Sequence, residues 1–221
     1  MTLTLDRDGA VLLPGAATGV LPEIEAALAE VPADRAGVRL NGLAGLRDLL
    51  APTGAIGALA AEVLGPATQP VRALLFDKSA ATNWALGWHQ DRTIVVRERR
   101  EVPGFGPWTV KQGLQHVAPP FALLETMVTL RVHIDPVPGD NAPLLVARGS
   151  HKRGRIAEGI VEAVVADSRV HACLAERGDV WIYATPILHA SDAAVRPARR
   201  RVLQIDFAAQ ALPGGLEWMG V

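Results

Sequence analysis

Short apolar segments separated by turn residues fill most of the chain after Val71. They are rich in Val, Ile, Leu and aromatic residues, and Gly, Pro or Asp bounds them. These segments read VRALLFD, RTIVV, MVTLRVHI, PLLVA, VWIYA and RRVLQIDFA. Runs of this length are typical of strands, and many short strands with frequent turns favour a sandwich or a barrel. We therefore expect a mainly β fold over about residues 71–209.

The preceding stretch, residues 18–66, has a helical pattern. LPEIEAALAEV and GLRDLLAPTGAIGALAAEVLG place Leu, Ile, Val and Ala three and four residues apart, and Gly65-Pro66 is a stop signal. A chain of 221 residues is long enough for one generous domain, and we find no obvious linker in it. We predict a single domain, residues 1–221, with an N-terminal helical segment followed by the strands.

Two segments interrupt the strand pattern. Residues 98–120 contain VPGFGPW and VAPP, which predict a long irregular loop, and we expect this loop to act as a lid over a site. Residues 156–166, IAEGIVEAVVA, predict a short helix between strands.

Charge and cysteine content narrow the classes of partner. The formal net charge is -1, so no chain-wide attraction to nucleic acid or anionic membrane is expected. The single cysteine, Cys173, allows no internal disulfide and suits a reducing compartment. The N-terminus lacks the pattern of a secretory signal, and no run of about 18 apolar residues is present. We expect a cytoplasmic protein that acts on a small molecule.

The stretch GWHQD, residues 87–91, places His89 and Asp91 two positions apart. Side chains at i and i+2 of a strand point to the same face, so an imidazole and a carboxylate would be presented together. A second imidazole would complete a two-histidine, one-carboxylate site that leaves metal coordination positions open. Among six histidines, His189 has the most suggestive setting, because it follows a turn at Gly178-Asp179 and the strand VWIYATPIL. Taken alone, each histidine is more often structural than a metal ligand.

Four stretches together resemble the phytanoyl-CoA dioxygenase family over about residues 71–209. They are WHQD at 88–91, NAPLLVARGSHKRG at 141–154, GDVWIYATPILHAS at 178–191 and RRRVLQIDFA at 199–208. The resemblance implies a double-stranded β-helix, which is a cupin-like jelly roll. It also implies an enzyme that uses Fe(II), 2-oxoglutarate and O2, with ascorbate as a supporting reductant. Such an enzyme hydroxylates a small-molecule metabolite and releases succinate and CO2.

The resemblance implies that His89, Asp91 and His189 bind the iron and that Arg200, eleven places after His189, anchors 2-oxoglutarate. A planar guanidinium with two parallel donors matches the distal carboxylate of this co-substrate. Arg199 and Arg201 leave the choice of arginine open. Strand alternation favours Arg200 because it shares a polar face, whereas the opposite face is apolar and suits burial against helices. The residues sharing the face of Arg200 are Val202, Gln204 and Asp206, and those opposite are Arg201, Leu203, Ile205 and Phe207.

Four further residues fall at positions where the family supplies pocket side chains. Ser191, Trp108 and Gln90 are candidates for contact with the co-substrate, and Lys78 is a candidate for contact with the substrate. Each has a plain alternative, respectively a turn serine, a packing tryptophan, an amide at the edge of the core and a surface lysine. One departure from the family pattern is Ala142, which stands where glycine is common after asparagine.

The strand from Thr129 to Ile134 alternates between apolar and polar residues, which places Arg131 and His133 on its polar face. The resemblance turns this face toward the cavity, so both residues are candidates for contact with the substrate. A buried cation needs an anionic partner, and we hypothesise that Arg131 binds a substrate carboxylate or phosphate. The alternative is an internal ion pair.

Two other functions are left open by the sequence. One is a jelly roll that binds a metal or ligand without turnover. The other is a nucleic-acid demethylase, suggested by Arg97, Arg99 and Arg100, although Glu98 and Glu101 dilute that patch and stacking aromatics are scarce. The metal-binding carboxylate also bears on the reaction, because related halogenases have a small residue there. Retention of Asp91 favours hydroxylation.

Overall fold

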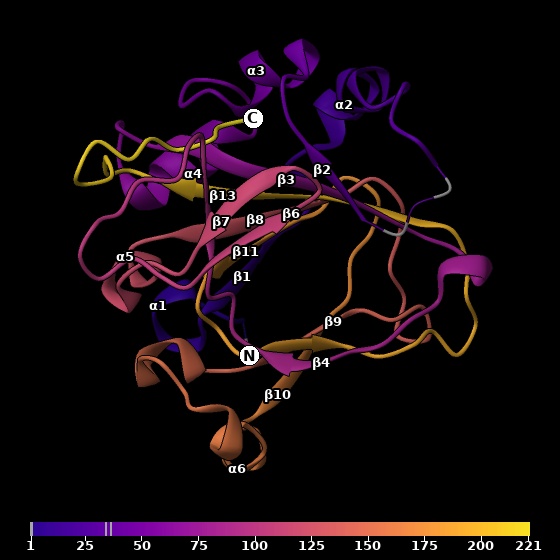
Figure 1. The fold of residues 1–221 in the computed structure, drawn as a ribbon. Helices are drawn as coiled ribbons and strands as arrows, with labels where there is room; N and C mark the ends of the chain where they lie inside the picture. Colours follow the sequence, from indigo (N-terminus) through magenta and orange to yellow (C-terminus); the bar gives the residue numbers. More distant parts are fainter. Residues whose placement is uncertain (1, 34, 36) are drawn as a thin grey trace.

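The computed structural model describes residues 2–33, 35 and 37–221, which form three antiparallel sheets. The largest sheet crosses the molecule and carries the longest strands, β3 and β13 (Figure 1). In the order in which they pair, its strands are β1 (Ala10–Leu13), β11 (Val180–Ala184), β8 (Val128–His133), β13 (Arg200–Ala208), β3 (Gln69–Lys78) and β2 (Val38–Leu40).

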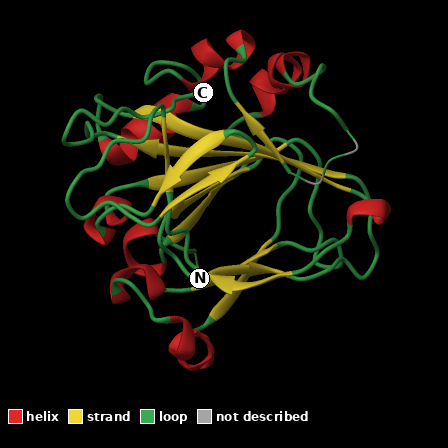
Figure 2. Cartoon of the chain, in the orientation of Figure 1, coloured by secondary structure: helices red, strands yellow, loops and turns green. Residues whose placement is uncertain are grey.

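A second sheet lies across from the large one, and the two together make the double-stranded β-helix that the sequence predicts (Figure 1). Its strands, in order of pairing, are β10 (Val170–Cys173), β9 (Leu144–Ala147), β12 (His189–Ser191) and β4 (Leu86–His89). The fold is mainly β, and its helices lie at the outside of the sheets (Figure 2).

The third sheet corrects the prediction of an irregular loop over residues 98–120. It consists of β5 (Ile94–Val96), β7 (Leu114–Val117) and β6 (Trp108–Lys111), and β6 and β7 form a hairpin. The turn residues Gln112 (φ 50°) and Gly113 (φ 79°) both have positive φ, as the favoured two-residue hairpin turns require. The prediction failed because Gln-Gly is a weak turn signal beside Asn-Gly or Asp-Gly, and because Gly and Pro dominate the flanking sequence.

Residues 18–66 contain α2 (Leu21–Ala27), α3 (Ala44–Leu50) and α4 (Gly57–Leu64), as their apolar spacing indicates. The edge strand β2 interrupts this helical stretch, and it is too short to leave a periodic signal in the sequence. A short helix predicted within 156–166 is present as α6 (Val161–Asp167). The remaining short helices are α1 (Leu5–Asp8), η1 (Thr18–Val20), η2 (Ala80–Thr82), α5 (Phe121–Glu125), η3 (Ser150–Arg153) and η4 (Glu158–Ile160).

Helices α2, α3 and α4 cover the outer face of the large sheet (Figures 1 and 2). The main core fills this interface, where Leu203 and Ile205 of β13 pack with Ile24 of α2 and Leu46 of α3. Arg201, which shares their face, reaches Glu25 of α2 through its guanidinium at 3.0 Å. Alternation along β13 therefore turns the other face of the strand, with its polar residues, toward the second sheet.

Replacement of Leu203 by alanine tests this division of the strand. Leu203 is fully buried, and its truncation is expected to lower the free energy of unfolding by about 2–5 kcal/mol, since a cavity would remain between sheet and helices. Urea unfolding measures this loss, and Val195→Ala at an exposed position is the control. A loss below about 1 kcal/mol would contradict this placement of the core.

Candidate metal centre

Two histidines a hundred positions apart meet because β4 and β12 pair. The strands are antiparallel, and His89 and His189 are direct register partners. Residues directly opposite each other in such a pair project to the same face, so the rings lie together with their centroids 4.2 Å apart. The sheet therefore supplies two of the three expected ligands as one cross-strand pair.

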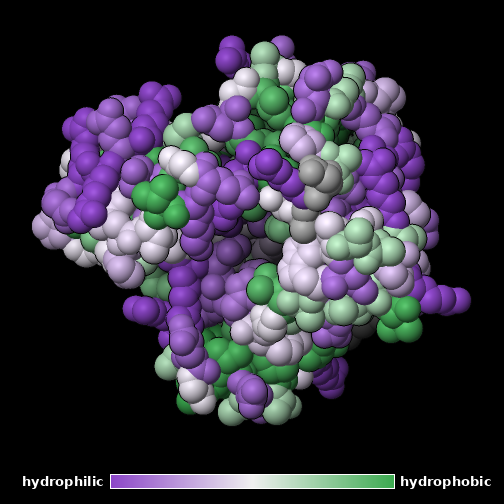
Figure 3. Space-filling model, turned by 45° about the vertical axis from the view of Figure 1, so that its right-hand side comes forward, coloured by the Kyte–Doolittle hydropathy of each residue, from purple (hydrophilic) through white to green (hydrophobic). Residues whose placement is uncertain are grey.

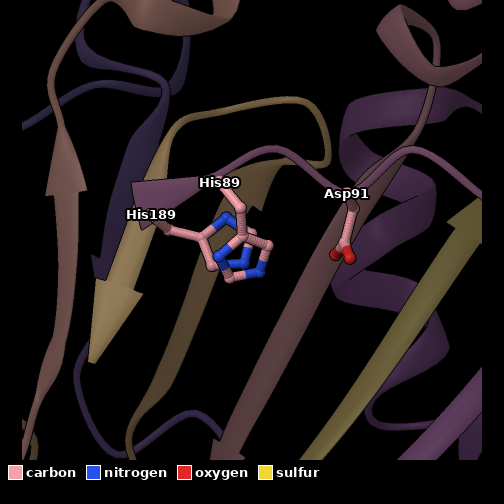
Figure 4. Close-up of side chains that lie close together, drawn as sticks. All are labelled: His89, Asp91 and His189. Carbon is pink, nitrogen blue, oxygen red and sulfur yellow. The ribbon is translucent and has the colours of Figure 1, made fainter. Parts of the chain in front are cut away.

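Asp91 joins the two rings from outside the strand, contrary to the expectation that a single strand would present it beside His89. β4 ends at His89, and the Asp91 carboxylate approaches the imidazoles from the segment that follows (Figure 4). One ligand atom from each of the three residues lies within 4.8 Å of the others. The spacing thus brings the predicted donors together, although by a different local conformation.

Gln90 explains why the chain leaves the sheet at this point. Its amide nitrogen donates to the carbonyls of Gly154 and Pro186 at 3.0 and 2.8 Å, and its oxygen accepts from the Ile156 amide at 2.9 Å. The side chain is buried, so these bonds fix the segment between His89 and Asp91 to two other loops. Gln90 borders the cavity, but it uses both amide hydrogens to hold this turn.

Both histidine rings are oriented by backbone carbonyls. Nδ1 of His89 lies 2.8 Å from the Gly87 oxygen, and Nδ1 of His189 lies 3.0 Å from the Ile187 oxygen. Because a carbonyl can only accept, each neutral ring carries its proton on Nδ1 and keeps the lone pair of Nε2 for a metal. Burial lowers the pKa of His189 to about 4, which keeps this ring neutral near pH 7.

Asp91 is held in its charged form by a neighbouring arginine. Burial alone would raise the pKa of Asp91, but Arg72 and the two imidazoles outweigh it and lower the pKa. The Arg72 guanidinium contacts Asp91 at 3.3 Å and Asp206 at 2.5 Å, and Asp206 also accepts from the Thr129 hydroxyl at 3.0 Å. Neither Arg72 nor Asp206 is among the site residues predicted from the sequence. Each could have been noticed in the sequence as a charged residue inside a largely apolar strand segment, VRALLFD for Arg72 and VLQIDFA for Asp206.

The donor set suits Fe(II). Two imidazole nitrogens and one carboxylate oxygen form a facial triad and leave coordination positions free for other ligands. The carbonyls behind the rings and the arginine behind the carboxylate orient these donors as outer partners orient metal ligands in other proteins. These features fit a resident iron at His89, Asp91 and His189.

The metal donors line a cavity of about 410 Å³ between the two main sheets. Figure 3 shows the molecule hollowed near the centre of one face, with hydrophilic side chains beside the hollow. Asp91 is the one carboxylate among the described residues that line this cavity, and many of the others are cationic. The basic residues are Arg39, Arg72, Lys78, Arg92, Lys111, Arg131 and Arg200, with His89, His116 and His189.

Arg200 and Lys78 occupy one side of the cavity as cross-strand partners on β13 and β3. Arg200 is 3% exposed and donates from one terminal nitrogen to the carbonyls of Asn141 and Ala142, while its Nε has no hydrogen-bond partner among the described residues. Ala142 has a positive φ of 53°, which explains why glycine is common at this position. Burial and then Arg131 lower the pKa of Arg200 to about 10.

Lys78 and Arg131 add two more cations near Arg200. The Lys78 ammonium donates to the Trp84 carbonyl at 2.8 Å, and burial, Arg200 and Arg131 lower the pKa of Lys78 to about 8. Arg131 donates to Gln204 at 2.8 Å. No carboxylate among the described residues forms an ion pair with Arg131, so the alternative of an internal ion pair has no support.

The other predicted pocket residues are placed differently. Ser191 borders the cavity and donates to the Ala142 carbonyl at 3.2 Å. Trp108 packs in an apolar cluster with Phe105 and Val117, and His133 is buried within the sheet. Neither Trp108 nor His133 is among the described residues that line the cavity. Burial lowers the pKa of His133 to about 3, so its ring is neutral near pH 7. His133 is therefore a buried neutral residue of β8 and not a residue of the cavity wall.

Comparison with known proteins identifies the family of the chain. The family model of phytanoyl-CoA dioxygenase (PhyH) matches residues 5–202. The chain belongs to this family. A dioxygenase of this kind requires Fe(II) and 2-oxoglutarate. That requirement fits the three candidate metal donors and the presence of Arg200 in the same cavity. His89, Asp91 and His189 remain the predicted catalytic residues.

Solved structures share the fold at low sequence identity. AviO1 from Streptomyces viridochromogenes Tue57 is similar with a TM-score of 0.64 and 20% identity, over 95% of this chain and 93% of that one. HygX from Streptomyces hygroscopicus with nickel and 2-oxoglutarate bound has a TM-score of 0.59 and 14% identity, over 92% and 84%. EctD from S. alaskensis with bound Fe has a TM-score of 0.58 and 16% identity, over 92% and 74%. A search of curated proteins found no match.

Within the described part of the chain, every helix is too short or too polar to cross a bilayer.

Arg72→Gln tests the support of the carboxylate ligand. Loss of the guanidinium would leave the buried Asp206 and the partly buried Asp91 without their cation, and the charged form of Asp91 would be less stable. We expect metal affinity to fall about 10- to 100-fold, as for other residues that orient metal ligands. Calorimetric titration with Ni(II) measures this, with Arg47→Gln on an exposed helix face as the control. Unchanged affinity in the Arg72 variant would show that the ion pair is dispensable.

Proposed function

We propose that this dioxygenase hydroxylates a small-molecule metabolite and releases succinate and CO2. The observation that carries the proposal is the convergence of His89, Asp91 and His189 in a cavity that also contains Arg200. When bound, iron would use O2 and 2-oxoglutarate to generate the oxidant, and the protein supplies orientation and exclusion of water. With its single cysteine buried, we propose that the protein works in the cytoplasm.

Arg200 is the residue best placed to hold the distal carboxylate of 2-oxoglutarate. Its guanidinium is buried in the cavity wall and keeps a free Nε, while Lys78 across the strand adds a second positive charge. Arg199 pairs with Asp77 and Arg201 pairs with Asp135, so neither neighbour offers a comparable free donor. Ser191 lies at the same cavity and is a further candidate contact.

Retention of Asp91 supports hydroxylation rather than halogenation, because the carboxylate occupies the position that a halide would need. Another outcome within this fold is shown by SnoN, an epimerase solved with Fe3+, α-ketoglutarate and nogalamycin RO. HygX has likewise been solved with hygromycin B bound, so small molecules are the ligands of these relatives. Arg131 remains our predicted contact for a substrate carboxylate or phosphate.

The two alternative functions receive less support. A nucleic-acid demethylase was suggested by Arg97, Arg99 and Arg100, but each of these forms an ion pair with a glutamate, namely Glu217, Glu101 and Glu98. A binding protein without turnover does not need a metal site with free coordination positions. Nor does it need Arg200, the predicted anchor of 2-oxoglutarate, in the same cavity. Succinate formation separates this last alternative from the proposal.

The proposal is tested by incubating the protein with Fe(II), ascorbate, 2-oxoglutarate and a metabolite panel, and measuring succinate together with product mass. Substrate-dependent succinate and a gain of one oxygen atom are expected. Asp91→Ala should abolish both, because it removes a metal donor. Ligand uptake without consumption of 2-oxoglutarate would support the binding protein, and a product of unchanged mass would support an epimerase.

Arg200→Gln tests the anchor of the co-substrate. Loss of a charge-assisted pair costs about 2–3 kcal/mol, so the KM for 2-oxoglutarate should rise roughly 30- to 150-fold. Arg199→Gln removes the same charge one position away, where the side chain pairs with Asp77 outside the cavity lining, and should leave this KM within about twofold. Equal effects in the two variants would contradict the assignment.

The pH dependence of co-substrate binding tests Lys78. Burial lowers the pKa of Lys78 to about 8, so its positive charge is present below this pH and is lost as the pH rises above it. The affinity for 2-oxoglutarate should therefore be flat from pH 6.5 to 7.5 and fall toward pH 9.5. Lys78→Met should bind more weakly at low pH and show a flatter profile. Titrations of the Ni(II)-loaded protein measure both, and an identical fall in the variant would exclude Lys78 as the cause.

A further inference from the structure

The cavity has a second basic side, where Arg39 of β2 and Lys111 of β6 are positively charged. His116 of β7 lies beside them as a neutral ring near pH 7, because burial and then Arg39 lower its pKa to about 4. We call these three residues the outer cationic cluster. Arg39 is the register partner of Leu74 on β3, which also lines the cavity. The tip of the β6–β7 hairpin is fastened to this edge strand, because Gln112 accepts from the Arg39 amide at 3.2 Å.

His116 is the least expected member of this cluster. It is 1% exposed, it borders the cavity, and neither ring nitrogen has a hydrogen-bond partner among the described residues. A buried imidazole without a partner is costly unless another group satisfies it. The Nε of Arg39 is also buried without a partner in the described part of the chain. Two elements therefore present unused donors to the same space.

The charges of this cluster are not balanced by the protein. Among the described residues, no carboxylate lies within ion-pair distance of Arg39 or Lys111. Asp91 is the one carboxylate of the described cavity lining, and Arg72 and the metal site engage it. The cluster thus lacks an anion that the cavity itself could provide.

The outer cationic cluster is too far from Arg200 to serve the same carboxylate. Arg200 pairs with Lys78 at one end of β3, whereas Arg39 pairs with Leu74, four residues further along the strand. At the rise of a β-strand this separates the two sites by about 13 Å along the sheet. A five-carbon diacid whose keto-acid end is at the metal cannot reach both sites. The donors of the outer cationic cluster are therefore free to bind a group of a second ligand.

We propose that the outer cationic cluster binds a phosphate monoester on the substrate. The inference rests on the proposed function, since it assigns to the substrate the part of the cavity that 2-oxoglutarate leaves free. A phosphate offers three oxygens and nearly two negative charges, which match three donors converging from three strands better than a carboxylate does. Held there, the substrate would extend across the cavity toward His89, Asp91 and His189.

The experiment uses the full chain loaded with Ni(II) and 2-oxoglutarate, so that no turnover is needed. Phenyl phosphate, benzoate and benzyl alcohol are titrated by calorimetry at low and moderate salt. Phenyl phosphate should bind, benzoate at least about tenfold more weakly, and benzyl alcohol without measurable heat, with salt weakening the binding of phosphate. Lys111→Glu and Arg39→Gln should each reduce phenyl phosphate affinity at least about tenfold.

Several controls keep the assignment specific. Lys111 is exposed on the hairpin, so its variant should keep the thermal unfolding midpoint of the parent protein, and Arg47→Gln should bind phenyl phosphate like the parent. The affinity for 2-oxoglutarate should stay within about twofold in Lys111→Glu. A parallel loss of 2-oxoglutarate binding would assign the cluster to the co-substrate and overturn the proposal.

Three further results would overturn it. They are equal binding of benzyl alcohol and phenyl phosphate, preference for benzoate, and phosphate affinity that depends on Arg131 but not on Lys111 or Arg39. Failure of the proposed function looks different, because it would appear as absent succinate formation while phosphate binding to the cluster persists.

Discussion

The active centre depends on the antiparallel pairing of β4 with β12. This pairing makes His89 and His189 register partners and so converts two distant segments into one metal-binding face. A register shift of one residue would turn one ring to the opposite side of the sheet, since side chains alternate along a strand. Gln90 then directs the chain out of the sheet, and Asp91 reaches the same point from a third direction.

The long strand β13 joins this centre to the rest of the fold because its two faces serve different purposes. One face packs Leu203 and Ile205 against the helices, and the other places Arg200 and Asp206 among buried polar groups. Burying charges is costly unless they are paired, and the Arg72 bridge between Asp206 and Asp91 provides that pairing. Stability of the sheet and the ionisation of a metal ligand are therefore linked through a single guanidinium.

The sequence predicts those parts of the fold that depend on local periodicity. The long strands and the two faces of β13 follow from alternation, and the metal donors follow from a motif together with family resemblance. The three-residue strand β2 and the hairpin of β6 and β7 were missed, because neither has a strong local signal. His116 had no motif around it, and only the tertiary position of the hairpin brings it to the cavity. Trp108 was predicted from the family resemblance, and His133 from strand alternation together with that resemblance. Packing places both outside the described cavity lining.

Net charge is a poor guide to the partner of this protein. The formal net charge of -1 predicts no particular electrostatic preference, yet the cavity gathers many cations around one lining carboxylate. Surface pairing explains the difference, since outer arginines such as Arg97 and Arg99 are matched by glutamates, whereas Arg39, Arg131 and Arg200 form no ion pair with any described carboxylate. Charge that is left unpaired in a concave site acts strongly on ligands, because the low-dielectric walls screen it less than bulk water does. The distribution of pairing, rather than the sum of charges, therefore gives this cavity its excess of positive charge.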